Sequence, residues 1–280
     1  MTGRVQGKVA LITGGGRGQG RSHALKLAAE GADIVAFEIC HDLKSVAYEL
    51  ASPDDLRQTV AEVEELDRRA IGIQGDVRDL NALTDAVSQA IGTFGKLDIV
   101  CANAGIASFV PGLGMEGWAE VAGTNLVGVM NTLHAALPAM TAGGSVIVTG
   151  SFAALMKGGV GGEPGGLAYS YAKRQLIEYV KWIGAAAALS GIRVNGIHPT
   201  KLQHPAAAQR RHLRPVSAGP GEPVPRRCAA RIRLAAAAAG RAVHRAGGHQ
   251  QRGAVPRLRG VPVRHWRVPQ RRRWRPPQAP

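Results

Sequence analysis

Short apolar runs alternate with segments of helical periodicity along the first 200 residues of the chain. Apolar runs at 8–15, 33–39, 70–77, 97–105, 144–151 and 192–199 predict six buried strands. Between them, residues 21–32, 52–69, 81–95, 116–140 and 168–190 place apolar side chains at helical spacing. Strands that alternate with helices form parallel β-α-β units. The pattern therefore predicts an α/β fold with a doubly wound parallel sheet.

Local signals define some of the helix ends. Gly31 is expected to stop the helix predicted at 21–32. Ser52 is a candidate N-cap for the helix at 52–69, and Pro53 suits its first turn. In open parallel sheets, ligands bind beyond the carboxyl ends of the strands, so the loops that follow each strand are the places to look for chemistry.

The composition changes abruptly after Thr200. Residues 201–280 hold 18 Arg and Lys201 against a single acid, Glu222, whereas residues 1–200 carry a net charge of −3. Eleven of the 16 prolines also lie in this tail. The basic charge that would otherwise suggest a nucleic-acid partner belongs to the tail alone. We therefore treat residues 1–200 as one domain and 201–280 as a separate segment, non-native or disordered.

Cysteine usage and hydropathy exclude some classes of protein. Cys40, Cys101 and Cys228 form no CxxC pair, which argues against a disulfide scaffold and fits a reducing cytoplasm. No signal peptide is visible, and no apolar run reaches the roughly 20 residues of a membrane span. No cluster of residues suggests a metal site. We expect a cytoplasmic domain without a membrane anchor.

The stretch TGGGRGQG, residues 13–20, follows the first strand and opens the first helix. Glycines at this place let the backbone approach a pyrophosphate and present amides at the positive end of a helix. The candidate cofactor-binding residues here are Gly14, Arg17, Gly18, Gln19 and Gly20. A plain glycine-rich turn is the alternative, but the strand before and the helix after favour a nucleotide.

An acid, Glu38, stands at the end of the second strand. A carboxylate there can accept hydrogen bonds from the adenosine ribose hydroxyls and repels a 2′-phosphate, so NAD is preferred over NADP. Arg17 weakens this preference slightly because it can contact a phosphate. An exposed strand-end carboxylate without a ligand is the alternative interpretation of Glu38.

Small or polar residues follow the third and fourth strands. Asp76 is placed to meet the adenine amino group and Val77 the adenine ring face. Asn103, Ala104 and Gly105 follow the fourth strand, where small residues let a cofactor lie close. By itself each of these groups is more often a turn than a site.

Tyr169 and Lys173 lie four residues apart and so share one face of a helix. An ammonium one turn away favours the phenolate and lowers the pKa of a tyrosine from about 10, so the pair can exchange a proton with an alcohol or carbonyl. Ser151, at the end of the fifth strand, can hydrogen-bond the substrate oxygen, and Asn125 can hold a water that returns protons to Lys173. Tyr171 competes for this role but has Gln175, not a lysine, four residues after it.

Together these residues resemble the classical short-chain dehydrogenase/reductases, with TGxxxGxG, an acid after the second strand, NAG, a mid-helix Asn, Ser and YxxxK in family order over residues 8–200. The stretch at 16–40, the insertion at 41–66 that follows it and HPT at 198–200 look like the mycofactocin-associated, carveol-dehydrogenase-like subgroup. The resemblance implies a Rossmann-like fold and tightly held NAD, with Tyr169, Lys173 and Pro199 also at the cofactor. It further implies oxidation of a secondary alcohol to a ketone and a homotetramer. KGGVGGEPGG at 157–166 and Ala102 depart from the common pattern.

The tail does not resemble the family's last segment, which should hold a threonine near the nicotinamide, helices over the substrate and a final strand. Residues 201–280 contain no Asp, Asn, Thr, Met, Phe or Tyr. A back-translation of 201–205 with one base removed from codon 201 can encode Asn-Cys-Asn-Thr-Pro, which restores the expected threonine. We therefore hypothesise that an inserted base shifted the frame, so that the chain is inactive or impaired.

Two other functions stay open at this point. A real basic arm containing Trp266 and Trp274 among arginines would bind phosphates and stack on bases. A non-catalytic NAD-binding sensor on the same fold is the second alternative, against which the complete set of proton-transfer residues argues.

Overall fold

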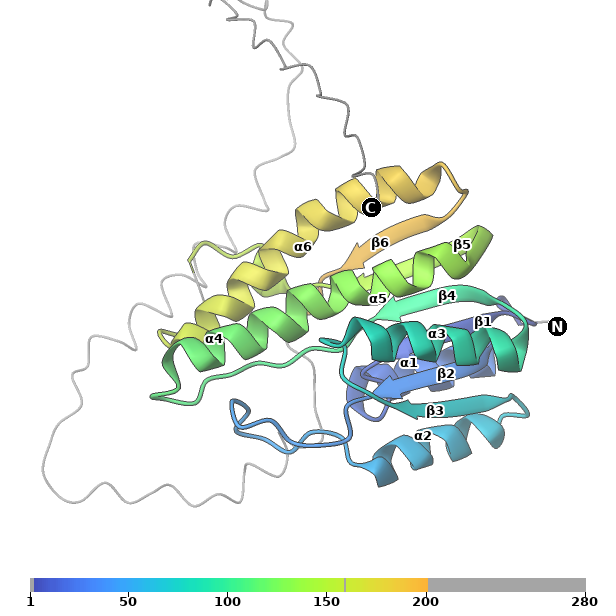
Figure 1. The fold of residues 1–280 in the computed structure, drawn as a ribbon, viewed down its shortest axis with the longest axis horizontal. Helices are drawn as coiled ribbons and strands as arrows, with labels where there is room; N and C mark the ends of the chain where they lie inside the picture. Colours follow the sequence, from blue (N-terminus) through green and yellow to red (C-terminus); the bar gives the residue numbers. More distant parts are fainter. Residues whose placement is uncertain (1–2, 159, 201–280) are drawn as a thin grey trace, which may run out of the picture. The chain divides into compact units, whose positions relative to one another are not determined.

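The computed structural model describes residues 3–158 and 160–200, and the predicted tail at 201–280 lies outside the described residues. These residues form a parallel six-stranded sheet of order β3-β2-β1-β4-β5-β6 (Figure 1). The strands are β1 (Val9–Thr13), β2 (Asp33–Glu38), β3 (Ala70–Gln74), β4 (Leu97–Ala102), β5 (Met140–Thr149) and β6 (Arg193–Ile197). This order reverses direction between β1 and β4, so the Rossmann-like doubly wound sheet predicted from the sequence is confirmed.

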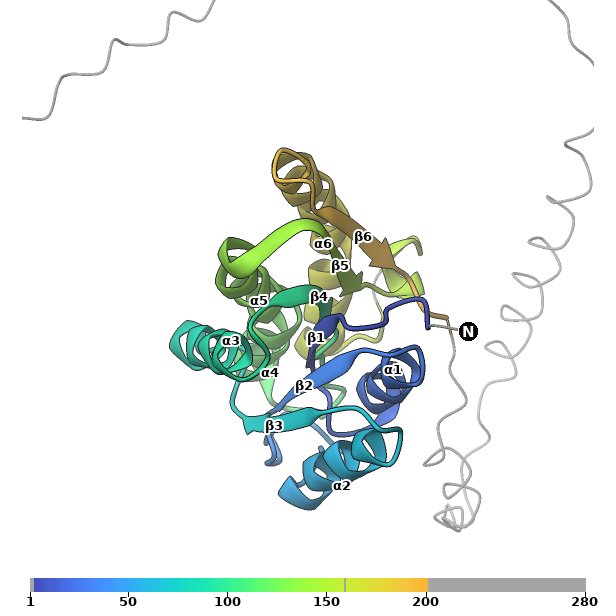
Figure 2. The ribbon, with the colours of Figure 1, turned by 90° about the vertical axis from the view of Figure 1, so that its right-hand side faces the viewer.

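Helices cover both faces of the sheet (Figure 2). The helices are α1 (Gly18–Ala29), α2 (Pro53–Glu64), α3 (Leu80–Phe94), α4 (Gly114–Ala122), α5 (Gly128–Ala136) and α6 (Pro164–Ala188). Helices α1 and α2 lie on one face, and α3, α5 and α6 lie on the other. Among the described residues, none of the helices is long and apolar enough to cross a membrane.

Each face has its own apolar core. Leu11, Val35, Val100, Leu133 and Leu176 are buried on the face that α3, α5 and α6 cover. On the opposite face, β-strand side chains such as Ile12 and Ile34 pack against Ala24, Leu56 and Val63 of α1 and α2. The central strands β1, β2 and β4 are buried along their whole length, as expected for a parallel sheet covered on both sides.

The N-terminus of α2 forms where its sequence signals predicted. Ser52 Oγ accepts a hydrogen bond from the Asp55 amide at 3.1 Å, and the Asp55 carboxylate accepts one from the Ser52 amide at 2.8 Å. This reciprocal pair is a capping box, and Pro53 occupies the first turn. Gly31, with φ of +98°, follows the end of α1 and confirms the predicted stop.

The predicted helix at 116–140 is not one continuous α-helix. Residues Gly123–Val127 form a π-helical segment between α4 and α5, and Leu137–Ala139 form a 3₁₀ turn. Met140 already belongs to β5, so that strand begins four residues before the predicted start at 144. At the other boundary, α6 begins at Pro164 rather than 168, which makes the end of the glycine-rich insertion its first turn.

Candidate functional site

A cavity of about 480 Å³ lies at the carboxyl ends of the central strands. It is bounded by the glycine loop, the end of β2, the residues after β3 and the residues after β4. Its lining includes the predicted cofactor residues Gly14, Arg17, Gly18, Gln19, Gly20, Glu38, Asp76, Val77, Asn103, Ala104 and Gly105. The fold therefore gathers residues from four separate loops at the edge where such sheets bind ligands.

The glycine loop passes close to the rest of the site. Gly14 has φ of +70°, and a Cβ there would lie 2.9 Å from the Ala104 Cα. At Gly20 a Cβ would lie 1.8 Å from the Gly14 carbonyl oxygen, so the first turn of α1 packs directly on the loop. These two contacts require glycine, the first for its backbone conformation as well as its size.

The N-terminus of α1 is open to a ligand. Among the described residues no side chain caps it, whereas Ser52 caps α2 and Asp79 caps α3. Uncapped amides at a helix N-terminus attract anions through their hydrogens and the helix dipole. Together with the close-packed glycines, this end of the cavity fits the diphosphate of a dinucleotide.

Glu38 is buried at the cavity wall, with 8% of its surface exposed. Its Oε2 accepts a hydrogen bond from the Gly16 amide at 2.9 Å, and its Oε1 accepts one from the Ile39 amide at 3.0 Å. Burial raises the pKa of this carboxyl, while the two amide bonds oppose the shift. Each carboxylate oxygen can accept a further hydrogen bond, so Glu38 can still accept hydrogen bonds from the hydroxyls of a ribose. The interpretation of Glu38 as an exposed strand-end carboxylate is wrong.

Asp76 is held by a neighbour two residues along the chain. Arg78 donates from Nε and from its amide to the Asp76 carboxylate, each at 2.8 Å. Burial raises the pKa of Asp76, but the Arg78 hydrogen bonds outweigh it and leave the pKa lowered. Arg78 also contacts Glu120 of α4 at 3.3 Å, and Glu120 in turn accepts the Ser45 amide. Arg78 thus fixes the Asp76 carboxylate, a hydrogen-bond acceptor, at this end of the cavity.

The segment between β2 and α2 supplies lining residues that motif-based reasoning missed. Leu43, Tyr48 and Leu50 line the cavity, and the Tyr48 hydroxyl accepts a hydrogen bond from the Ala107 amide at 3.1 Å. The Arg17 guanidinium lies 5.9 Å from the Tyr48 ring centroid and donates to the Glu49 carbonyl at 2.5 Å. The unusual length of this segment was the available signal, but its side chains match no motif.

Asn125 lies in the π-helical segment and is fully buried. Its Oδ1 accepts from the Ile106 amide and its Nδ2 donates to the Ile106 carbonyl, both at 2.8 Å. A Cβ on Gly105 would lie 3.2 Å from Asn125 Oδ1 and 3.6 Å from Lys173 Nζ. Asn125 and Lys173 therefore approach each other beneath Gly105, which itself lines the cavity. π-segments in helices are frequent at functional sites.

Lys173 is buried in α6, with 3% of its surface exposed. Its Nζ donates to the Thr149 carbonyl at 2.7 Å and lies 5.9 Å from the centroid of the Tyr169 ring. Burial lowers the pKa of this amine to about 8. Tyr169 is only half-buried and packs beside the apolar cluster of Ile106 and Val121. The Lys173 amine and the Tyr169 ring thus lie near each other on one side of α6, as the four-residue spacing predicted.

Ser151 follows β5 in extended conformation, and its Oγ accepts the Ala153 amide at 3.1 Å. His198 Nδ1 lies 3.3 Å from the Ser151 amide nitrogen and 3.2 Å from its carbonyl oxygen. The Pro199 carbonyl accepts the Phe152 amide at 2.9 Å. The backbone of the HPT motif therefore continues the β5–β6 pairing around Ser151.

The structure does not place every expected residue at the cavity. Tyr169, Lys173 and Pro199, expected at the cofactor, are absent from its lining, and so are Asn125 and Ser151. The chain beyond Thr200 lies outside the described residues, so the cavity is defined by the part before it. The described residues also hold no cluster of three or more His, Cys, Asp or Glu suited to a metal ion.

The chain is similar in sequence and fold to known proteins. A family model described as short chain dehydrogenase matches residues 8–214. (−)-trans-Carveol dehydrogenase of Rhodococcus erythropolis is 44% identical over 209 residues, 72% of this chain and 73% of that protein. Carveol dehydrogenase from Mycobacterium avium in complex with NAD has a TM-score of 0.67 and 38% identity, covering 72% of this chain and 74% of that one. A short chain dehydrogenase from Mycobacterium paratuberculosis bound to NAD has a TM-score of 0.64 and 36% identity, covering 70% and 73%.

NAD, the cofactor expected from Glu38, is thus the dinucleotide bound in both of these structural neighbours. The matched residues contain the glycine loop, Asn125, Ser151, Tyr169 and Lys173. The chain belongs to the short chain dehydrogenase family.

Proposed function

We propose that the chain is an NAD-dependent oxidoreductase of the alcohol dehydrogenase type, which interconverts a secondary alcohol and a ketone. One observation carries the proposal. The buried amine of Lys173, one helical turn from Tyr169, donates a hydrogen bond to the Thr149 carbonyl and lies 5.9 Å from the centroid of the Tyr169 ring. A cation near a phenol stabilises negative charge on the phenol oxygen, which proton exchange with an alcohol requires.

The residues that would hold NAD are those of the cavity. The uncapped amides of α1 suit the diphosphate, Glu38 suits the adenosine ribose, and Asp76 with Val77 suits the adenine. Asn103, Ala104 and Gly105 leave room beside the sheet for the rest of the molecule. When bound, NAD supplies the acceptor for the hydride that leaves the alcohol carbon.

The side chains near β5 and α6 would handle the proton. Tyr169, as the phenolate, takes the proton from the alcohol oxygen, and Ser151 Oγ fixes that oxygen by a hydrogen bond. Lys173 stabilises the phenolate through its charge. In the reverse direction, in which Tyr169 gives its proton to the ketone oxygen, Lys173 returns a proton to the phenolate. Asn125 holds the Ile106 segment through both of its amide atoms, and it retains one further N–H and one lone pair for a bridging water.

We also propose that the chain as translated is impaired in turnover. The relatives named above are matched over 73–74% of their own length, so about a quarter of each has no counterpart in this chain. The hypothesised frame shift at codon 201 accounts for that quarter and for the change of composition after Thr200. Without the family's closing segment, β6 is an edge strand within the described residues.

The substrate class is inferred from the relatives. Two of them are named carveol dehydrogenases, which favours an apolar cyclic secondary alcohol for the intact form of this protein. Membership of the mycofactocin-associated subgroup, a homotetrameric assembly and a cytoplasmic location are further parts of this proposal, each carried by the resemblance in sequence.

The experiment compares the chain as translated with a frame-restored chain in an assay of NADH formation with cyclic secondary alcohols. We expect turnover from the restored chain and at least tenfold less from the chain as translated. NAD binding without turnover by the restored chain would instead support the non-catalytic sensor.

A further inference from the structure

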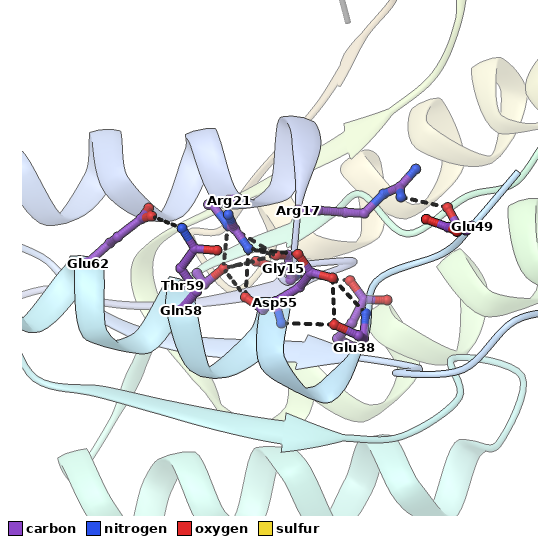
Figure 3. A network of polar contacts seen from close by, with 11 residues as sticks. Gly15, Arg17, Arg21, Glu38, Glu49, Asp55, Gln58, Thr59 and Glu62 are labelled. Atoms are coloured by element: carbon purple, nitrogen blue, oxygen red, sulfur yellow. Dashed lines mark hydrogen bonds and ion pairs between the residues drawn. The ribbon is translucent and has the colours of Figure 1, made fainter. Parts of the chain in front are cut away.

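Two side chains outside the glycine loop form hydrogen bonds with its main-chain carbonyls. Arg21 of α1 donates from Nε and Nη2 to the Gly16 carbonyl, at 3.1 and 2.6 Å (Figure 3). Thr59 of α2 places its Oγ1 3.1 Å from each of the Gly15, Gly16 and Asp55 carbonyls, and its one hydroxyl hydrogen is shared among these acceptors. Two successive carbonyls of the loop are therefore anchored to side chains from two different helices.

The two anchoring side chains also bind each other. Arg21 Nε lies 2.9 Å from Thr59 Oγ1, and Arg21 Nη2 donates to the Asp55 carbonyl at 2.7 Å. Thr59 is completely buried, and Arg21 keeps only 19% of its side chain exposed. Since Asp55 belongs to the capping box of α2, the loop is tied to the first turn of that helix. We call Arg21 and Thr59 the carbonyl clamp.

The clamp acts on the same peptide group that holds Glu38. The peptide between Gly15 and Gly16 offers its carbonyl to Thr59 and its N–H to Glu38 Oε2 at 2.9 Å. In the next peptide, between Gly16 and Arg17, the Gly16 carbonyl accepts a hydrogen bond from Arg21. Because this peptide is trans, its C=O and N–H point in opposite directions. Fixing that carbonyl on Arg21 thus directs the Arg17 N–H away from the clamp.

We propose that Arg21 and Thr59 are positioning residues of the cofactor site. They set the orientation of the loop peptides, and through the Gly16 amide they set the position of the Glu38 carboxylate. The inference rests on the proposed function, because the ligand whose affinity they control is NAD. Neither side chain lines the cavity, so both act through the loop and not by touching the cofactor.

The binding test is NAD titration by calorimetry on the full chain, with matched variants. Thr59→Val removes the hydroxyl at nearly constant shape, and Thr59→Ser keeps it. We expect the Kd for NAD to rise about tenfold in Thr59→Val and less than about threefold in Thr59→Ser. Arg21→Lys keeps the charge but loses the planar fork, and we expect about a tenfold rise. Arg57→Lys, on the exposed part of α2, is the control and should leave the Kd unchanged.

Amide hydrogen exchange separates positioning from loss of the fold. In the ligand-free protein, Gly16 N–H should exchange about tenfold faster in Thr59→Val and Arg21→Lys than in the wild type. The Val35 and Val100 amides, in buried strands, should keep their rates. Unchanged Gly16 exchange and unchanged NAD affinity in both variants would overturn the proposal. If the wild type fails to bind NAD, the proposed function fails, and the Gly16 exchange rates alone decide whether the clamp holds the loop.

Discussion

Lys173 Nζ donates a 2.7 Å hydrogen bond to the main-chain oxygen of Thr149, which joins α6 to the carboxyl end of β5. Thr149 lies two residues before Ser151, and Lys173 lies one helical turn after Tyr169. The contact therefore brings a buried amine to the end of the strand that leads into Ser151. It explains how residues that are far apart in sequence come to share one chemical environment.

The Lys173 amine should make the stability of the fold depend on pH. Its pKa is about 8 in the fold and 10.5 in the unfolded chain, so the unfolded state binds more protons between these values. Stability relative to Lys173→Met should therefore rise from pH 8 to 10.5, by up to about 1.4 kcal/mol per pH unit. Below pH 8 the difference in the free energy of unfolding between the wild type and Lys173→Met should stay constant. Urea unfolding of both proteins at several pH values measures it, and parallel profiles would contradict the assignment.

Asn125 should matter for stability as well as for chemistry. Asn125→Ala leaves the Ile106 N–H and C=O without the partner each has at 2.8 Å. We expect a loss of about 2–6 kcal/mol, because each of the two buried groups left unpaired costs about 1–3 kcal/mol. Chemical unfolding checks this value. Asn131→Ala, which removes a half-buried asparagine in α5 bonded to the Val77 and Arg78 carbonyls, should cost less. Equal losses would show that the π-segment has no special role.

Glu38 should control the choice between NAD and NADP. We expect Glu38→Ser to weaken NAD about tenfold and to narrow the difference in Kd between NAD and NADP, because the charge that repels a 2′-phosphate is removed. Calorimetric titration with both dinucleotides provides the measurement. Asp42→Ser, which removes a carboxylate from the segment between β2 and α2, is the matched control and should leave the ratio of the two Kd values unchanged. A ratio unaffected by Glu38→Ser would remove Glu38 from the ribose site.

Tyr169 should be essential for turnover and dispensable for binding. In the frame-restored chain, Tyr169→Phe should lower kcat by about 10²–10⁴-fold, because it removes the group that accepts the alcohol proton. Tyr171→Phe is the control, since Tyr171 is exposed and its ring centroid lies 5.7 Å from that of Trp118, with the two rings tilted by 38°. Comparable rates from the Tyr169→Phe variant and its parent would refute the proton-transfer role.

The sequence predicted the parts of this molecule that local chemistry determines. The strand pattern, the Ser52 cap and the glycine loop each follow from residues within a few positions of one another. Glu38 was placed at the cavity because the end of a parallel strand determines where the next side chains lie. The Asp76–Arg78 pair is also local, although its effect on the Asp76 pKa depends on burial that the sequence does not reveal.

Other features depend on contacts between distant segments. The π-segment at Gly123–Val127 accompanies the pairing of Asn125 with Ile106, 19 residues earlier, so helical periodicity alone predicted a continuous helix. Arg21 and Thr59 meet at the loop only because α1 and α2 pack side by side on the same face of the sheet. Side chains that hydrogen-bond to the carbonyls of a loop follow no spacing pattern in the sequence. The roles of Arg21 and Thr59 were therefore not predicted.

Residues before Thr200 should form a working NAD site in this chain as it is translated. Titration of the full-length protein with NAD, followed by calorimetry and by the shift in melting temperature, tests it most directly. We expect saturable binding to one site per chain, tighter for NAD than for NADP and accompanied by a rise in melting temperature. A folded chain that binds neither dinucleotide, or that binds NADP more tightly than NAD, would contradict it.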